Sequence, residues 1–194
     1  MIINSVNLIE LVALVTANDL SGMTDYLVNE IEKLARAGAD FGVIAANTPH
    51  LVFDSVNERS PIPLISIVAA TCDRARNLGL EKVGLFGTRF TMQARFYLDV
   101  FSRAGLRIIL PNEEEQSYIH EKYMSDLVNG VILPETRARL LAIVDKMKAR
   151  DGIEGLILGG TELPLILRDE EHNGVPFLDT TRIHVDRIVT ELLS

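Results

Sequence analysis

The stretch FGVIAANTPH, residues Phe41–His50, is apolar as far as Ala46 and turns polar at Asn47. A short apolar run that stops abruptly is typical of a strand that is buried on both faces and ends in a loop. Similar runs occur at Pro63–Ile67, Lys82–Thr88, Arg107–Leu110, Gly155–Gly160 and Val175–Leu178. Together these runs predict the short, buried strands of a mostly parallel sheet.

Amphipathic segments separate the apolar runs. From Met23 to Ala35, apolar residues recur every three or four positions, behind an expected N-cap at Ser21 and before a glycine at Gly38 that suits the C′ position. Further helices are expected up to Arg76, over Met92–Ala104, over residues 114–129 and 135–149, and from Thr181 onward. Strands that alternate with helices predict an α/β fold with mostly parallel sheets wrapped by helices.

The chain contains one internal repeat. Gly38–Ser66 and Gly152–Thr180 share the same order: glycine, acidic residue, apolar strand, small polar turn, charged loop and a second strand opened by proline. We therefore expect two pseudo-symmetric three-layer lobes with a cleft between them, lobe 1 being residues 1–68 plus 179–194 and lobe 2 residues 69–178. Ligands of parallel sheets bind beyond the carboxyl ends of the strands, so the turns after the two apolar runs are candidate sites. The alternative is that they are ordinary turns.

Composition and charge limit the class of protein. The chain has 194 residues, of which 47% are hydrophobic and 24% charged, and its net charge of −8 includes no block of lysine or arginine. We therefore expect a globular protein that binds neither nucleic acid nor a membrane surface. The single cysteine, Cys72, cannot form an intramolecular disulfide, and no Cys/Cys or His/Cys pair has the spacing of zinc ligands. This cysteine usage favours a cytoplasmic location. No apolar run approaches the ~20 residues of a membrane span, and the N-terminus lacks a signal-peptide pattern.

The two candidate turns resemble a known pair of motifs. The first turn reads Ala46-Asn47-Thr48 and the second reads Gly160-Thr161-Glu162. They are similar to the active-site motifs of the aspartate/glutamate racemase superfamily, aspartate racemase branch, in which the strands end in Cys-Asn-Thr and Gly-Cys-Thr-Glu. The resemblance covers essentially the whole chain and continues through KVGLFGTRFTM (Lys82–Met92), IHEKYMSDL (Ile119–Leu127) and FLDTTRIH (Phe177–His184).

The resemblance implies an amino-acid racemase that needs neither pyridoxal phosphate nor a metal. In that chemistry a thiolate removes the α-proton of a small dicarboxylic amino acid, and a thiol on the opposite face delivers another. Here Ala46 and Gly160 stand at the two thiol positions, so we expect little or no racemisation. One alternative is a non-catalytic dicarboxylate-binding or interaction protein. Another is that the natural enzyme carries both thiols and this chain is a deliberately disabled form.

Short polar residues around the turns are the candidate ligand-binding groups. By resemblance, Asn47, Thr48 and Thr161 line the substrate cleft, although such residues also form turns and helix caps. Thr88 and Thr91 either bind an anion or cap the helix that follows them.

The remaining candidates are titratable. Glu162 and His184 would orient or tune a neighbouring thiol; without one, they are either spectators or independent acid–base groups. Cys72 is interpreted as a small buried core residue of a helix rather than a replacement thiol. The other histidines are interpreted as structural or solvated, without metal-ligand spacing: His50, His120 and His172.

The first residues resemble the second strand of the racemase family rather than the first. IINSVN, residues 2–7, is therefore expected to be a strand, and lobe 1 is expected to lack its first strand–helix unit. Met1 is either the true start or the result of a shortened chain. Because a missing strand would leave a sheet edge unpaired, we expect a homodimer.

Overall fold

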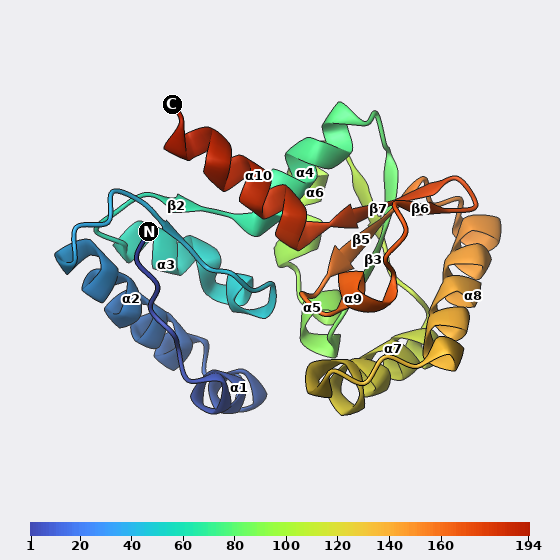
Figure 1. Cartoon of the computed structure of the whole chain (residues 1–194), viewed down its shortest axis with the longest axis horizontal. Helices are drawn as coiled ribbons and strands as arrows, with labels where there is room; N and C mark the ends of the chain where they lie inside the picture. Colours follow the sequence, from blue (N-terminus) through green and yellow to red (C-terminus); the bar gives the residue numbers. More distant parts are fainter. The chain divides into compact units, whose positions relative to one another are not determined.

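The computed structural model describes all residues from 1 to 194 (Figure 1). The chain divides into two compact units. The smaller unit comprises Met1–Ala45 and Pro49–Ser66, and the larger unit comprises Ala46–Thr48 and Ile67–Ser194. None of the helices is both long enough and apolar enough to span a membrane.

The smaller unit is mainly helical. Its helices are α1 (Leu8–Thr16), α2 (Leu20–Arg36) and α3 (Phe53–Arg59). It also contains most of a 3₁₀ helix, η1 (Thr48–Val52), whose first residue, Thr48, belongs to the larger unit. Its two strands, β1 (Gly42–Val43) and β2 (Leu64–Ile65), form a parallel pair. The helix α2 packs against both α1 and α3 and buries the apolar side chains Met23, Leu27 and Ile31.

Two predictions for the smaller unit are corrected, and one is confirmed. The N-cap of α2 is Asp19 rather than Ser21, because the Asp19 carboxylate accepts a hydrogen bond from the Gly22 amide at 2.8 Å. The strand predicted over Phe41–Ala46 contains only two residues and is half-buried, since β2 is its only neighbour. Gly38 does occupy the C′ position, with φ of 90°.

Residues 2–7 form no strand, so this prediction is also wrong. Their polar groups bond to α2 instead of to a sheet neighbour. The Asn4 amide donates to Glu30 Oε2 at 2.7 Å, and the Asn7 backbone N–H donates to the Tyr26 hydroxyl at 2.8 Å. The Asn7 side chain then caps α1.

The larger unit is built on a five-stranded sheet in the order β4-β3-β5-β7-β6. The bounds are β3 (Lys82–Gly87), β4 (Arg107–Ile109), β5 (Gly155–Gly159), β6 (Glu171–His172) and β7 (Val175–Asp179). All pairs are parallel except β6 with β7. The predicted α/β fold with a mostly parallel sheet is therefore confirmed.

Helices cover both faces of this sheet. They are α4 (Ile67–Asn77), α5 (Arg89–Gln93), α6 (Phe96–Arg103), α7 (Glu113–Ser125), α8 (Pro134–Asp151), α9 (Leu163–Ile166) and α10 (Thr180–Leu192), with a 3₁₀ turn η2 (Leu127–Asn129). Strand residues alternate between two cores: Leu85 and Ile157 pack with α4 and α6, whereas Phe86 packs with α7 and α8. Since successive strand residues point to opposite faces, this alternation produces three layers.

Two helix predictions and one boundary differ from the structure. The helix predicted over Met92–Ala104 is split into α5 and α6, because Ala94 adopts an extended backbone with ψ of 157°. The helix predicted over residues 114–129 ends at Ser125, and η2 follows it. The sequence assigns residues 179–194 to lobe 1, but α10 groups with the larger unit because it packs against α4 and β5.

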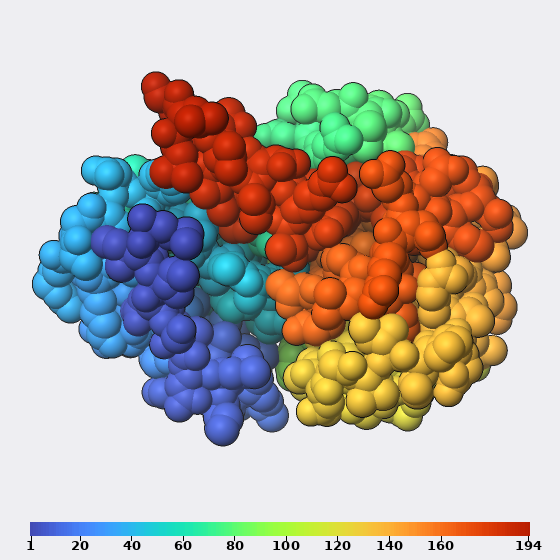
Figure 2. All heavy atoms as spheres, in the orientation of Figure 1, coloured from blue at the N-terminus to red at the C-terminus, as the bar shows by residue number.

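The last turns of α10 lie at the surface, where Figure 2 shows them in red. Several apolar side chains of this helix are exposed: Val185, Val189 and Leu192, followed by Leu193. The opposite side of the helix carries Thr180 and His184, which are buried. The helix is therefore anchored by one side and leaves an apolar strip on the other.

Candidate functional site

The carboxyl ends of β3 and β5 lie side by side, because Gly87 pairs with Gly159 in the parallel ladder. Both positions require glycine. A Cβ atom on Gly87 would lie 2.8 Å from the Gly159 carbonyl oxygen, and one on Gly159 would lie 2.8 Å from the Phe86 carbonyl oxygen. The absence of side chains lets Thr91 pack directly over the strand ends. The residues that follow the strands, Thr88 and Gly160, are thus brought to one edge of the sheet.

Three threonine hydroxyl groups meet at this edge, and we call them the threonine cluster: Thr48, Thr88 and Thr91. The Thr48 oxygen lies 3.5 Å from that of Thr88 and 3.4 Å from that of Thr91, and the latter two are 3.2 Å apart. Thr88 also caps α5 by accepting a bond from the Thr91 amide at 3.3 Å. Capping is therefore confirmed for Thr88, and anion binding by the cluster stays a prediction.

Asn47 is buried, and both ends of its amide are hydrogen-bonded. Its Nδ2 donates to Thr180 Oγ1 at 3.1 Å, and its Oδ1 accepts from the Tyr97 hydroxyl at 2.6 Å. Thr180 in turn donates to the Leu158 carbonyl at 2.8 Å. Burial raises the pKa of Tyr97, which keeps this phenol as a donor. These bonds fix the segment Ala46–Thr48 to β5 and α6 within the larger unit, a structural role that the sequence analysis did not assign to Asn47.

The space beside Gly160 is occupied by Tyr123. A Cβ atom on Gly160 would lie 2.5 Å from Tyr123 Cε2, 2.6 Å from its hydroxyl oxygen and 2.8 Å from Cζ. Tyr123 belongs to α7, and its side chain is buried. The phenol therefore fills the volume into which any side chain at position 160 would project.

Glu162 accepts two hydrogen bonds on one carboxylate oxygen. The Tyr123 hydroxyl donates to Oε2, and the Thr161 hydroxyl donates to the same atom at 2.7 Å. Burial raises the pKa of Tyr123, and the hydrogen bond and charge of Glu162 raise it further. Tyr123 is thus a neutral phenol and a dedicated donor to Glu162. Sequence reasoning missed this residue although the quoted motif IHEKYMSDL contains it.

The other titratable candidates lie in separate surroundings. Cys72 is buried in the core between α4 and the sheet, and its pKa is raised, chiefly by burial, so it is an inert thiol as predicted. His184 is buried on the inner side of α10. His50, in the smaller unit, is buried and stacks on Phe53 with ring centroids 4.8 Å apart, which agrees with its structural interpretation.

His120 and His172, interpreted from the sequence as solvated, are half-buried, and each has a polar partner. His120 Nδ1 accepts a hydrogen bond from the Arg89 amide at 3.1 Å, and burial lowers the pKa of His120. His172 Nε2 lies 3.0 Å from Asp145 Oδ1. His120 thus links α7 to the start of α5, and His172 links β6 to α8.

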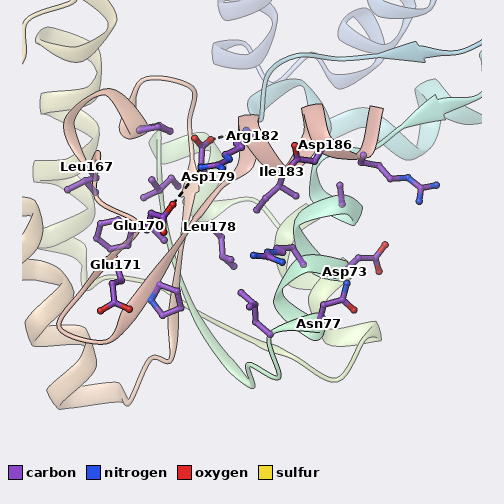
Figure 3. A pocket seen from close by; sticks show the side chains of 18 of the residues that line it. Asp73, Asn77, Leu167, Glu170, Glu171, Leu178, Asp179, Arg182, Ile183 and Asp186 are labelled. Atoms are coloured by element: carbon purple, nitrogen blue, oxygen red, sulfur yellow. Dashed lines mark hydrogen bonds and ion pairs between the residues drawn. The ribbon is translucent and has the colours of Figure 1, made fainter. Parts of the chain in front are cut away.

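The larger unit also contains a hollow of ≈ 950 Å³. Figure 3 shows that side chains from α4, β7, α10 and the loop before β6 surround it. Its lining mixes both charges, for example Arg182 and Glu170 at 3.9 Å from each other. None of the threonine cluster lines it. This hollow offers no single charge for a ligand, and neither Gly160 nor Glu162 lines it.

Comparison with known proteins identifies the family. Residues 1–188 match the sequence model of the Asp/Glu/Hydantoin racemase family. The chain belongs to this family. A racemase-family protein of Bacillus subtilis strain 168, a broad specificity amino-acid racemase, is 22% identical over 184 residues, which are 91% of this chain and 75% of that protein.

Solved structures of the racemase family agree with the fold. A Yersinia pestis protein assigned as an Asp/Glu racemase superposes with a TM-score of 0.91 at 30% identity, covering 100% of this chain and 84% of the other. An aspartate racemase homologue from Pyrococcus horikoshii OT3 gives a TM-score of 0.85 at 33% identity, covering 100% and 83%. A glutamate racemase from Francisella tularensis shares the fold, with a TM-score of 0.63 at 20% identity over 90% of this chain and 65% of that one.

Proposed function

We propose that this racemase-family protein binds a small dicarboxylic amino acid at the carboxyl ends of β3 and β5, without racemising it by thiol-to-thiol proton transfer. The observation that carries the proposal is the threonine cluster, whose three hydroxyl groups lie within 3.5 Å of one another at the strand ends. Hydroxyl groups rotate freely and can turn their protons toward an incoming carboxylate.

The chemistry proposed for the site follows from the residues that flank the cluster. Neither Ala46 nor Gly160 has a side chain that can accept or donate a proton, and the single thiol of the chain, Cys72, is buried in the core. A two-base racemisation needs one proton-transfer group on each face of the α-carbon. The Bacillus subtilis relative is an amino-acid racemase with broad specificity, which supports an amino acid as the ligand here. Binding requires no cofactor in this proposal.

The binding half of the proposal is tested by calorimetry with L-aspartate and L-glutamate. The variant Thr48→Val keeps the size of the side chain and removes one hydroxyl of the cluster. We expect it to weaken binding by about 10- to 100-fold, the loss of one hydrogen bond to a charged group. The matched control is Thr190→Val, because the Thr190 hydroxyl is exposed on α10 and bonds only to the Asp186 carbonyl at 2.9 Å.

If Thr48→Val and Thr190→Val weaken the affinity for the amino acid equally, the threonine cluster is not part of the ligand site. If the wild-type protein binds neither amino acid, the proposal fails. The non-catalytic interaction protein then becomes the better interpretation, and the exposed apolar strip of α10 would be the surface to study.

A homodimer is the second part of the proposal. The strand β1 has β2 as its only strand neighbour, so the other edge of β1 can join another chain. Multi-angle light scattering should give twice the chain mass of 21.5 kDa at micromolar concentration. A single-chain mass across the whole concentration range would contradict it.

A further inference from the structure

The contact between Tyr123 and Gly160 gives the candidate site a wall. A phenol lies where the side chain at position 160 would project, within 2.5–2.8 Å of the place of its Cβ atom. Since position 160 directly follows β5, beside the end of β3, the Tyr123 ring belongs to the same sheet edge as the threonine cluster. We therefore count Tyr123 among the residues of the site.

Two hydrogen bonds beside the Tyr123 ring fix the orientation of the Glu162 carboxylate. Tyr123 and Thr161 both donate to Oε2 of Glu162, which leaves Oε1 with neither of these bonds. Both donors are neutral hydroxyl groups, so neither neutralises the negative charge of the carboxylate. An ionised carboxylate has about four lone-pair sites and can accept further donors on the second oxygen.

We propose that Tyr123 and Thr161 position Glu162 so that its Oε1 atom accepts the ammonium group of the bound ligand. This inference rests on the proposed function and names the group that distinguishes an amino acid from a plain dicarboxylate. Hydroxyl groups at Thr48, Thr88 and Thr91 then face carboxylate oxygens, and Glu162 faces the opposite charge. The site thus separates the two charges that a zwitterionic amino acid carries at its α-carbon.

The test compares L-aspartate with succinate, which has the same two carboxylates and no ammonium group. In calorimetry with the wild-type protein, we expect L-aspartate to bind about 10-fold or more tightly than succinate, because a charge-assisted hydrogen bond is lost in succinate. Glu162→Gln should remove this preference, weakening L-aspartate by a similar factor and leaving succinate unchanged or slightly tighter. The matched control is Glu121→Gln, an exposed carboxylate on α7, which should preserve the preference.

Two further variants separate positioning from folding. Tyr123→Phe keeps the ring and deletes only the bond to Glu162, so it should reduce the aspartate-to-succinate ratio by about 3- to 10-fold, a smaller loss than in Glu162→Gln. Gly160→Ala should act in the same direction, because its Cβ atom displaces the phenol from Glu162. A purely structural role of Tyr123 would weaken both ligands equally and leave the ratio unchanged.

The outcomes distinguish this inference from the function on which it rests. If L-aspartate and succinate bind equally well to the wild-type protein, or if Glu162→Gln preserves the ratio, the ammonium assignment is overturned and dicarboxylate binding stands. If neither compound binds, the proposed function fails as well. A ratio that falls in Glu162→Gln and in Tyr123→Phe, but not in Glu121→Gln, supports the assignment.

Discussion

L-Aspartate incubated with this protein in heavy water should acquire no deuterium at its α-carbon beyond the enzyme-free blank. The two positions that resemble the proton-transfer sites of the family hold Ala46 and Gly160, neither of which has a side-chain acid or base. Loss of one general acid or base costs about 10²–10⁴-fold in rate, and groups that act as a unit fail together. Proton NMR measures this exchange as the loss of the aspartate Hα signal over several days.

The exchange experiment needs two controls. Calorimetry on the same preparation shows whether the ligand is bound under the assay conditions, so that a lack of exchange is not a lack of binding. A preparation of Glu162→Gln shows whether any residual exchange comes from the only carboxylate of the two turns. Enzyme-dependent deuteration that disappears in Glu162→Gln would mean that this carboxylate acts as a base. That result would contradict the proposal of a site without proton transfer.

The apolar runs predicted the strands of the larger unit well and those of the smaller unit poorly. β3 and β5 are nearly as long as predicted because strands with neighbours on both sides bury almost every residue, and consecutive apolar residues reflect that burial. The run Phe41–Ala46 has the same apolar character but only one neighbouring strand, so most of it lies outside the ladder. Hydropathy reports burial, whereas strand length also depends on partners that only the tertiary structure supplies.

The candidate site was predictable where it depends on strand ends and unpredictable where it depends on helix packing. Thr88 and Thr91 lie beside Gly160 because β3 and β5 are neighbouring parallel strands that end at one edge, which the order of strands and turns already implies. Thr48 follows β1 of the other sheet, and its approach to these two threonines is a result of the tertiary structure. Tyr123 lies 39 positions before Glu162 and reaches it through the packing of α7 on the sheet. A tyrosine within a helix motif carries no sign of which glycine it will cover. The close contact with Gly160 is therefore a result of the structure alone.

That contact determines what should happen when the two thiols are introduced. On the resemblance alone, Ala46→Cys combined with Gly160→Cys should restore proton exchange. In the structure, a Cβ atom at position 160 would lie 2.5 Å from Tyr123 Cε2, so the new thiol and the phenol compete for one space. We expect the double variant to exchange the aspartate α-proton only weakly, because the cysteine or the ring is forced out of position.

Removing the far end of the ring should relieve this competition. Tyr123→Leu keeps an apolar side chain in the core and deletes Cε2, Cζ and the hydroxyl group, the three atoms that the new Cβ would meet. At saturating L-aspartate, we expect the triple variant to exchange about 10²-fold faster than the double variant, the contribution of one correctly placed proton-transfer group. The matched control carries Gly160→Cys and Tyr123→Leu with Ala46 unchanged. It has a thiol on one face only, so it can exchange a proton without converting L- into D-aspartate.

The comparison of these variants tests both the steric argument and the assignment of the two positions. Circular dichroism and thiol titration establish that each variant is folded and reduced before rates are compared. Equal exchange in the double and triple variants would show that Tyr123 does not obstruct position 160. The triple variant could bind L-aspartate and contain both introduced thiols in reduced form, in addition to Cys72, yet exchange no α-proton. In that case Ala46 and Gly160 are not the proton-transfer positions. Formation of D-aspartate by the triple variant alone requires a proton from each face, and therefore places both residues beside the α-carbon of one bound ligand.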